Sequence, residues 1–528
     1  MKKEKWLKLT LATGMTLSMA TMFSSTTFAE SALDPAPQIA AKIVNENAGK
    51  KVLFDNTHGQ TAGTADWVID GGFSDFGNGI ANKGFYVKEL RKSTPVTYDD
   101  LKNYDVFIVP EANIPYKKSE QDAMLQYVKN GGSIFFIADH YNADRNKNRW
   151  DSSEVFNGYR RGAWENPAKG MSSEEASSQA MQGVESSDWL ANNFGVRFRY
   201  NAIGDVSTDK IVAPDQSFGI TTGVSSVAMH AGSTIAIVNP NLAKGIVYLP
   251  ESLPKWNNAV DSGVYNGGGI AEGAYVAVAK VGLGKAAFIG DSSPVEDATP
   301  KYVREDTGQS KKTYDGYKEE SDATLLTNVV KWLSTKESYT SLKQVNGLQL
   351  DTPTPLKSFE QPSASTEPQP EPWSAPNQGY QWFNSSTFKP GSYGYNNNNT
   401  DNNNNDGNVS TSDYNFIHPS ILPNNGVFQI KIQAAHLLPN TTYSNYSLGI
   451  YTSGGTQVAK VQNANGIWPS SYGYSNSFSF TTNSQGSAEK VVNVQIAPNT
   501  VGQATLRLRQ NTTVKENKTV VIGTPAIR

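Results

Sequence analysis

Short, continuously apolar runs alternate with amphipathic stretches from residue 30 to about residue 345. Runs of the buried-strand type occupy residues 51–55, 101–110, 132–139, 234–238, 245–249, 274–278 and 285–291. Stretches with helical spacing occupy residues 79–91, 119–129 and 320–333. Continuously apolar strands that alternate with helices are typical of a sheet that is covered on both faces. We therefore predict an α/β domain over residues 30–345, built on a doubly wound, mainly parallel sheet.

The pattern changes after residue 345. Residues 351–376 are rich in Pro, Ser, Thr and Glu, and residues 396–408 are mostly Asn, so residues 346–410 are expected to be a stiff, solvated linker. Period-2 alternation then predicts a small all-β sandwich over residues 411–528. Its expected strands are residues 426–432, 446–451, 477–481, 490–496 and 504–509. The corner from Leu437 to Tyr443 is similar to that of fibronectin-III-like and Ig-like modules.

The first 29 residues have the pattern of a secretory signal peptide. Four lysines within residues 1–8 precede a mostly apolar run over residues 9–23, and Thr27-Phe28-Ala29 places small residues ahead of Glu30. The alternative is an uncleaved membrane anchor, but the run is short and interrupted by Thr and Ser. We therefore expect cleavage after Ala29, a secreted extracellular protein, and no membrane insertion after cleavage.

Composition narrows the chemistry. The chain contains no cysteine, which excludes disulfides, thiolate nucleophiles and zinc sites built on Cys. The net charge is only −3, but residues 377–528 carry nine Lys or Arg against five Asp or Glu. This basic balance favours an anionic polymer as a partner of the C-terminal module; an ordinary fluctuation in surface charge is the alternative.

Acidic residues and histidines follow four of the predicted strands. The carboxyl ends of parallel strands meet at one edge of a doubly wound sheet, where ligands bind, so we expect these side chains to converge. They are Asp55, His58, Glu111, Asp139, His140 and Asp291. Singly, each has a simpler explanation: an Asp after a strand often caps a helix, a lone Glu can pair with a surface Lys, and a lone His is more often structural.

In combination, these groups predict a metal site, because packed carboxylates repel one another unless a positive charge lies among them. We expect Asp55, His58, Asp139 and Asp291 to bind a divalent ion. Mixed oxygen and imidazole ligands leave Mg, Mn, Ca and Zn open. His140 or Glu111 would then act as general base or acid.

Cationic and aromatic residues gather in the predicted insert over residues 141–181. Guanidinium groups bind phosphate and aromatic rings stack on bases, so Arg145 is expected to neutralise charge on a reacting phosphate. The expected substrate-binding residues are Arg149, Trp150, Arg160 and Arg161. A second insert, residues 303–314, could add to this surface. Solvated surface loops are the alternative explanation for both inserts.

Several motifs together resemble the class I glutamine-amidotransferase-like superfamily. They are Val-Leu-Phe-Asp-x-x-His-Gly at residues 52–59, Leu-x-x-Tyr-Asp-Val-Phe-Ile-Val-Pro at 101–110, Tyr-Val-x-x-Gly-Gly-Ser-Ile-Phe-Phe-Ile at 127–137, and residues 220–224, 282–285 and 328–333. The resemblance spans roughly residues 50–335, is closest to the secreted, trehalose-utilisation-like branch, and implies a flavodoxin-like fold. Amidotransferases have a nucleophilic Cys where this chain has Asp139-His140, so glutamine hydrolysis is not expected.

The leading functional hypothesis is a secreted, metal-dependent hydrolase of an anionic polymer, with a phosphodiester such as extracellular DNA or RNA as the expected substrate. The first alternative is a non-catalytic protein that binds nucleic acid or cell-wall glycan through the sandwich. Its aromatic candidates are Trp382, Tyr393, Tyr395, Trp468, Tyr472 and Tyr474. The second alternative is a sugar hydrolase or isomerase that uses two carboxylates as acid and base.

Overall fold

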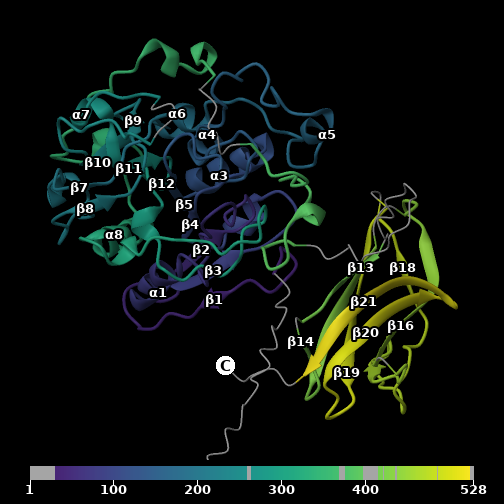
Figure 1. The fold of residues 1–528 in the computed structure, drawn as a ribbon. Helices are drawn as coiled ribbons and strands as arrows, with labels where there is room; N and C mark the ends of the chain where they lie inside the picture. Colours follow the sequence, from purple (N-terminus) through teal and green to yellow (C-terminus); the bar gives the residue numbers. More distant parts are fainter. Residues whose placement is uncertain are drawn as a thin grey trace, which may run out of the picture.

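The structure is a computed structural model that describes residues 30–258, 263–367, 375–395, 414–419, 421–434, 437–452, 454–483 and 486–523. Residues 30–395 form an α/β body and residues 414–523 form a β-sandwich (Figure 1). The expected signal peptide lies outside the described residues. None of the helices in the described part of the chain has the length and apolarity needed to cross a membrane.

A ten-stranded sheet forms the centre of the α/β body. Its strand order is β1 (Gln38–Ile39), β3 (Tyr86–Leu90), β2 (Lys51–Asp55), β4 (Val106–Val109), β5 (Ser133–Ile137), β12 (Gly284–Ile289), β11 (Ala274–Val281), β9 (Ile235–Ile237) and β6 (Val196–Phe198), and β10 (Ala243–Tyr248) also pairs with β11. The run from β3 to β12 is parallel. The pairings of β1, β6, β9, β10 and β11 are antiparallel.

The prediction of a doubly wound, mainly parallel α/β fold is therefore wrong. Within the described residues the sheet has five antiparallel pairings against four parallel ones, and the chain has more residues in strands than in helices. The physical reason is connection length. Only Gly282 and Leu283 separate β11 from β12, whereas a parallel pairing needs a crossover of a dozen or more residues.

Helices cover both faces of the central sheet. They are α1 (Ser74–Asn82), α2 (Tyr98–Leu101), α3 (Lys118–Lys129), α4 (Ser152–Asn157), α5 (Ser173–Ala176), α6 (Trp189–Phe194), α7 (Gly269–Glu272) and α8 (Asp322–Leu333). Short 3-10 helices occur at Pro214–Gln216, Ser293–Val295, Gly316–Lys318, Leu342–Gln344, Ser358–Glu360, Pro362–Ala364 and Ser385–Thr387. A separate hairpin pairs β7 (Val206–Thr208) with β8 (Val227–Met229).

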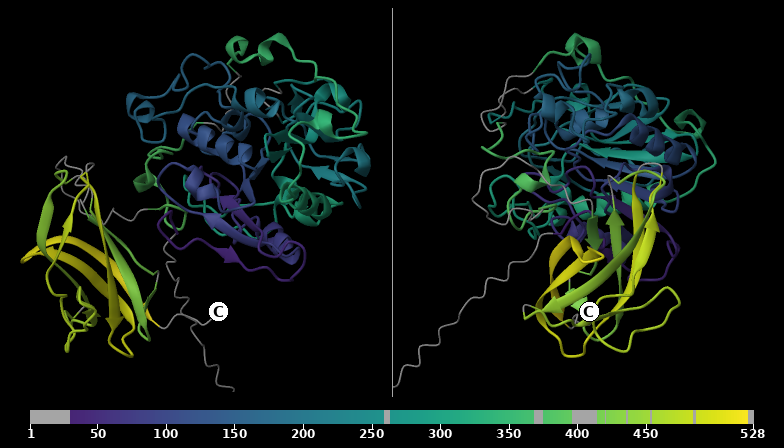
Figure 2. Two further views of the ribbon diagram at one scale, coloured as in Figure 1. Left: turned by 180° about the vertical axis from the view of Figure 1, so that it is seen from behind. Right: turned by 90° about the vertical axis from the view of Figure 1, so that its right-hand side faces the viewer.

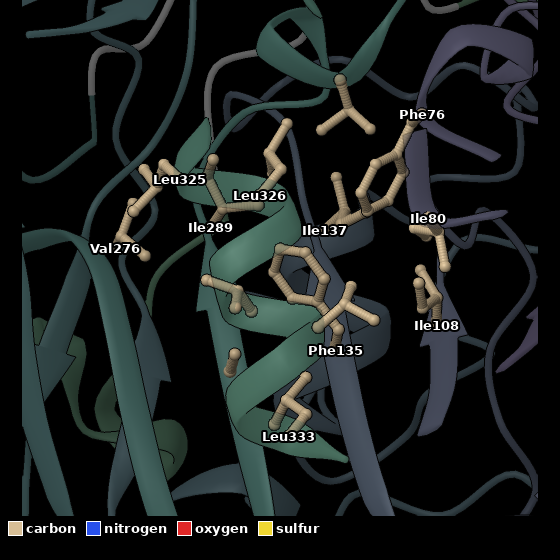
Figure 3. Packing of buried hydrophobic residues seen from close by; sticks show 14 of the residues in the cluster. Phe76, Ile80, Ile108, Phe135, Ile137, Val276, Ile289, Leu325, Leu326 and Leu333 are labelled. Carbon is tan, nitrogen blue, oxygen red and sulfur yellow. The ribbon is translucent and has the colours of Figure 1, made fainter. Parts of the chain in front are cut away.

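Each face of the sheet has its own hydrophobic core. Helices α1 and α8 bury Phe76 and Leu326 against Phe135 and Ile137 on one face (Figure 3). Helices α3, α4 and α6 pack on the other face, where Phe136 lies in the core. Successive strand residues point to opposite faces, so neighbouring residues of β5 belong to different cores. This alternation also decides where residues just beyond each strand point.

One predicted helix is shorter than expected. The prediction ran from residue 79 to residue 91, but α1 ends at Asn82 and β3 begins at Tyr86. Gly84 has φ of +92°, a left-handed conformation that ends helices and favours glycine. The chain can therefore turn at Gly84 and enter β3, the strand next to the edge of the sheet, in which Val87 and Glu89 are buried.

The segment expected to be a solvated linker packs against the α/β body where the structure describes it. The Thr354 backbone N–H donates to the Ile237 carbonyl over 2.8 Å, and Glu360 forms an ion pair with Arg199 at 2.8 Å. Trp382 is buried, and its indole N–H donates to Glu175 over 2.8 Å. The Asn tract lies outside the described residues.

The sandwich is built from two sheets (Figure 2). One has the order β13 (Tyr414–Ile417), β15 (Val427–Ala434), β19 (Ala488–Ile496) and β17 (Ala459–Val461), and the other β14 (Ile421–Pro423), β21 (Thr513–Gly523), β20 (Gly502–Gln510), β16 (Thr442–Thr452) and β18 (Phe478–Thr481). Ile430, Leu448 and Leu506 lie in its core. At the corner between β15 and β16, the Leu438 N–H donates to the Tyr443 hydroxyl over 3.0 Å.

Replacing Trp382 tests the packing of the former linker. We expect Trp382→Ala to lower the free energy of unfolding of the α/β body by about 3–5 kcal/mol, because it opens a large cavity and removes one of the donors to Glu175. Urea unfolding followed by near-UV circular dichroism measures this. Trp468→Ala, in a half-buried loop of the sandwich, is the matched control. A loss below about 1 kcal/mol for Trp382→Ala, the level of an ordinary surface substitution, would show a solvated segment.

Candidate functional site

The carboxyl ends of four parallel strands lie next to one another at one edge of the sheet. Strands β2, β4, β5 and β12 are consecutive neighbours, and Ile137 of β5 pairs with Ile289 of β12. The residues that follow these strands include Asp55, Glu111, Asp139 and Asp291. All four carboxyl groups are buried.

The predicted residues nevertheless form two groups instead of one. Phe54 belongs to the core on the α1 and α8 face, so the next residue, Asp55, points to the α3 face. Ala138 belongs to the α3-face core, so Asp139 points the opposite way. Asp291 follows Ile289 by two residues and shares its face, the same face as Asp139. The contacts show the division directly, because Asp55 contacts His58 and Tyr116 whereas Asp139 contacts Arg145.

The first group, here called the imidazole group, consists of Asp55, His58, Tyr116 and Glu120. His58 Nδ1 lies 3.1 Å from Asp55 Oδ2, and His58 Nε2 lies 3.3 Å from Glu120. The Tyr116 hydroxyl donates to Asp55 Oδ2 over 2.9 Å, and its ring packs on the imidazole with centroids 4.0 Å apart. The Glu120 carboxylate also accepts the Lys117 N–H at the start of α3.

The charges in the imidazole group stabilise one another. Burial alone would lower the pKa of His58, but the Glu120 and Asp55 carboxylates outweigh it and raise that pKa to about 10. Burial alone would raise the pKa of Glu120, but His58 outweighs it and lowers that pKa to about 2. His58 is therefore a buried imidazolium between two carboxylates at neutral pH. A permanently charged imidazole of this kind fixes the edge of the sheet and is a poor proton shuttle.

The second group, here called the acid cluster, consists of Glu111, Asp139, Asp291 and Glu296 with Arg145. Arg145 forms an ion pair with Asp139, and its Nε lies 3.5 Å from Glu111 Oε1. Asp291 accepts the backbone N–H groups of His230 and Ser293 over 2.5 and 2.9 Å.

Glu296 is anchored at the margin of the acid cluster. It accepts the Trp67 indole N–H over 2.7 Å and the Ser292 hydroxyl over 2.9 Å. Within the described structure, neither carboxyl oxygen of Glu111 has a hydrogen-bond partner. Glu111 is thus a completely buried carboxyl whose neighbours in the cluster are the Arg145 guanidinium and Asp139.

Burial and mutual repulsion govern protonation in the acid cluster. Burial first, and then the Asp139 carboxylate, raise the pKa of Glu111 well above its usual range, against the opposing effect of Arg145. Burial and Asp139 likewise raise the pKa of Asp291, and burial raises that of Glu296. A neutral Glu111 carboxyl therefore lies beside an Asp139 carboxylate that is paired with a guanidinium.

Imidazole and aromatic rings surround the acid cluster. His140 packs edge-on against Trp256, with ring centroids 5.1 Å apart, and its Nδ1 lies 2.7 Å from the Tyr141 carbonyl. His230 stacks on Tyr314 at 4.6 Å and lies 2.6 Å from Glu319. Tyr314 is 48% exposed, so this rim reaches solvent.

The loop that carries Arg145 has an unusual backbone. Asn142, Asp144, Lys147 and Arg149 all have positive φ, between 33° and 68°. Such conformations are costly for residues other than glycine and tend to cluster at functional sites. Asp151 stabilises the loop, since its carboxylate accepts the backbone N–H groups of Asn142 and Asp144.

The residues expected to bind an anionic substrate already have partners inside the protein. Arg149 pairs with Glu175 at 2.5 Å. Arg160 is buried and donates to the carbonyls of Pro167 and Lys169. Arg161 lies over the Tyr141 ring at 5.4 Å, and Trp150 is buried in the α3-face core. These four residues hold the insert in place and do not present a free cationic surface.

The expected metal ligands do not fit a metal centre. Asp55 and His58 belong to the imidazole group, where His58 lies between the carboxylates of Asp55 and Glu120, whereas Asp139 and Asp291 belong to the acid cluster. Arg145 supplies the positive charge that the acid cluster needs. Among the described residues, no group of three or more His, Asp or Glu is arranged to hold a metal ion.

Three residues of these groups, Tyr116, Glu120 and Glu296, were not selected from the sequence. Glu120 lies within a predicted helix, and its position near the helix start indicates a capping role, but nothing indicates that it reaches His58. Glu296 comes from the turn after β12, where Ser292, Pro294 and Asp297 favour a turn without specifying its direction.

The imidazole group makes stability depend on pH in a defined way. The folded pKa of His58 is above its unfolded value, so its contribution is complete below about pH 6.5 and is lost as pH rises towards 10. The folded pKa of Glu120 is below its unfolded value, so its contribution is present above about pH 4.5 and is lost as pH falls towards 2. We expect Glu120→Gln to be most destabilising between these limits, at about pH 4.5–6.5.

Urea midpoints of wild type and Glu120→Gln between pH 3 and pH 10 measure this dependence. The exposed Glu174→Gln is the control and should change the midpoint little at any pH. A Glu120→Gln effect that stays constant from pH 5 to pH 10 would contradict the charged pair.

Comparisons with known proteins place the chain in no family. No family model matches it, and no curated protein matches it. Among solved structures, the mmIFT52 N-terminal domain is 12% identical over 55% of this chain and 100% of its own, with a TM-score of 0.33. A putative lipoprotein from Bacillus anthracis is 13% identical over 21% of this chain and 74% of its own, with a TM-score of 0.17. At these TM-scores, the similarities carry no inference about function.

Proposed function

We propose that the protein is a hydrolase of neutral glycans and that the acid cluster is its acid–base centre. The observation that carries the proposal is the pair formed by Glu111 and Asp139. A buried carboxyl with a raised pKa, 3.5 Å from the Arg145 guanidinium, lies beside a carboxylate that is paired with the same guanidinium. Two carboxyl groups in different protonation states are what glycosidic hydrolysis requires.

The roles follow from the protonation states. Glu111 donates its proton to the glycosidic oxygen as the bond from that oxygen to the anomeric carbon breaks. Asp139 accepts a proton from the attacking water, whose oxygen forms the new bond to the anomeric carbon. The proton on Asp139 then returns to Glu111 through solvent or across the pair, which restores the starting state with no net change in the enzyme.

The charge of the site favours a neutral substrate over a phosphodiester. The four carboxyl groups of the cluster share one guanidinium, that of Arg145, and it is already paired with Asp139, so the cluster offers no unpaired cation to a phosphate. The rim offers the side chains of Trp256, Tyr314, His140 and His230, whose flat rings and polar nitrogens suit the faces and hydroxyl groups of sugars. Metal-dependent cleavage of extracellular nucleic acid, and secretion, both stay predictions from the sequence.

Arg145 controls access to the pair. Its side chain is 24% exposed, whereas that of Glu111 is completely buried. A substrate therefore has to displace the guanidinium before it reaches Glu111.

Removal of the proton on Glu111 is the decisive test. We expect Glu111→Gln to lower kcat at least about a hundredfold, with a smaller effect on KM, because the amide cannot protonate the leaving oxygen. Reducing ends released from a panel of neutral polysaccharides measure the rate. Asp322→Asn is the matched control, since Asp322 is also a buried carboxyl with a raised pKa but lies at the start of α8. Equal activity of Glu111→Gln and wild type would rule out this acid.

Chelation separates this proposal from the metal-dependent hypothesis. We expect hydrolysis of a neutral glycan to be unchanged after dialysis against EDTA, because Arg145 and not a metal ion neutralises the cluster. Plasmid DNA incubated with the same samples gives the parallel readout for a nuclease. Glycan activity that is lost in EDTA and restored by Mg, Mn, Ca or Zn would contradict the proposal.

A further inference from the structure

Two arginines lie side by side on the outer face of one sandwich sheet. Arg507 and Arg509 alternate along β20 with Leu506 and Leu508, which are buried in the sandwich core. Residues two apart on a strand point to the same face and lie about 7 Å apart. Both guanidinium groups therefore project from the same surface, in a row along β20, which is flanked by β16 and β21.

Each guanidinium lies over a tyrosine ring. Arg509 lies 3.5 Å from the centroid of Tyr474, and Arg507 lies 4.7 Å from that of Tyr451. The ring of Tyr474 in turn covers Gly449, where a Cβ would come within 2.8 Å of the ring atoms. Glycine at this position lets the ring lie flat on the sheet.

The Nε atom of each arginine is also occupied. Arg507 Nε donates to Asn517 over 2.6 Å, and Arg509 Nε donates to Ser447 over 2.8 Å. Within the described structure neither arginine forms an ion pair with a carboxylate. Stacking and the Nε bond fix each side chain, and the terminal nitrogens, which form the fork that binds a carboxylate in two parallel hydrogen bonds, stay available.

The surroundings favour a carbohydrate over a nucleic acid. Residues on the same face of β20 and of its neighbour β21 include Gln503, Thr505 and Thr519, whose amide and hydroxyl groups suit sugar hydroxyls. The Tyr474 ring is covered by Gly449 on one side and by Arg509 on the other, so it has no free face for a base to stack on. Residues 414–523 carry seven Lys or Arg against two Asp or Glu, which adds a general attraction for polyanions.

We propose that this face, here called the arginine face (Tyr451, Tyr474, Arg507 and Arg509), binds a carboxylated polysaccharide. Two uronate groups of one chain each take one guanidinium fork, and the polar side chains around them take the hydroxyl groups. The arginine face is separate in sequence from the acid cluster, and the proposal does not depend on the hydrolase proposal.

Binding to polygalacturonate oligomers tests the proposal on the full chain. We expect wild type to bind, with an affinity that falls as salt rises, and Arg507→Gln/Arg509→Gln to bind at least tenfold more weakly in calorimetric titration. Lys431→Gln/Lys490→Gln is the matched control, because it removes the same charge from the other sheet of the sandwich and should change the affinity less than twofold. Thermal melting checks that each variant is folded.

Two further comparisons make the outcome decisive. Arg507→Lys/Arg509→Lys keeps the charge but lacks the planar fork, so we expect it to recover only a small part of the lost affinity. Single-stranded oligo(dT) and neutral dextran should bind more weakly than polygalacturonate. The proposal is overturned by an absence of polygalacturonate binding, by equal losses in the two glutamine variants, by full recovery with lysine, or by tighter binding of oligo(dT).

Discussion

The arrangement of the α/β body depends on how four buried carboxyl groups are accommodated at one edge of its sheet. Burial raises the pKa of Glu111, Asp291 and Glu296, and a single guanidinium, that of Arg145, lies among the four groups. Because one cation cannot balance four anions, protons have to remain on some of the carboxyls at neutral pH. The raised pKa of Glu111 beside the ion pair of Asp139 with Arg145 follows from this constraint, and the chemistry proposed for the two groups rests on it.

The same physical problem has a second solution on the opposite face of the sheet. There His58 is the cation, and two carboxylates are close enough to keep it charged. The charges balance better, hydrogen bonds tie Asp55 to Tyr116 and His58, and nothing in the group is left to react. A satisfied network stabilises the fold, whereas the acid cluster, with the raised pKa of Glu111, keeps the capacity for chemistry.

The sequence predicted which residues follow the strands, but not which side chains these residues contact. The order of apolar runs placed Asp55, Glu111, Asp139 and Asp291 at the ends of strands that are neighbours in the structure, since β2, β4, β5 and β12 are parallel. Period-2 alternation, which can be read from the same runs, would have separated Asp55 from Asp139. The two-residue connection Gly282-Leu283 likewise indicates an antiparallel hairpin. Glu120 contacts His58, and Glu296 contacts Trp67. Both contacts depend on the paths of the connecting loops, which local sequence patterns do not specify.

The segment around Trp382 shows a different limit of prediction from sequence, namely that average composition does not show whether a segment is packed. Its composition is polar on average, and average polarity predicts solvation, yet a few aromatic residues are enough to fix such a segment to a neighbouring core. The two proposed sites also differ in charge: the one in the α/β body is rich in carboxyl groups and the one in the sandwich is rich in guanidinium groups. The acid cluster repels anions, whereas the arginine face attracts them. A polymer that carries both carboxylated and neutral stretches would satisfy both sites, with the sandwich holding the charged stretch while the uncharged one enters the acid cluster. Specificity would then come from the pattern of charge along the polymer, because one site takes the carboxylated stretch and the other takes the neutral stretch.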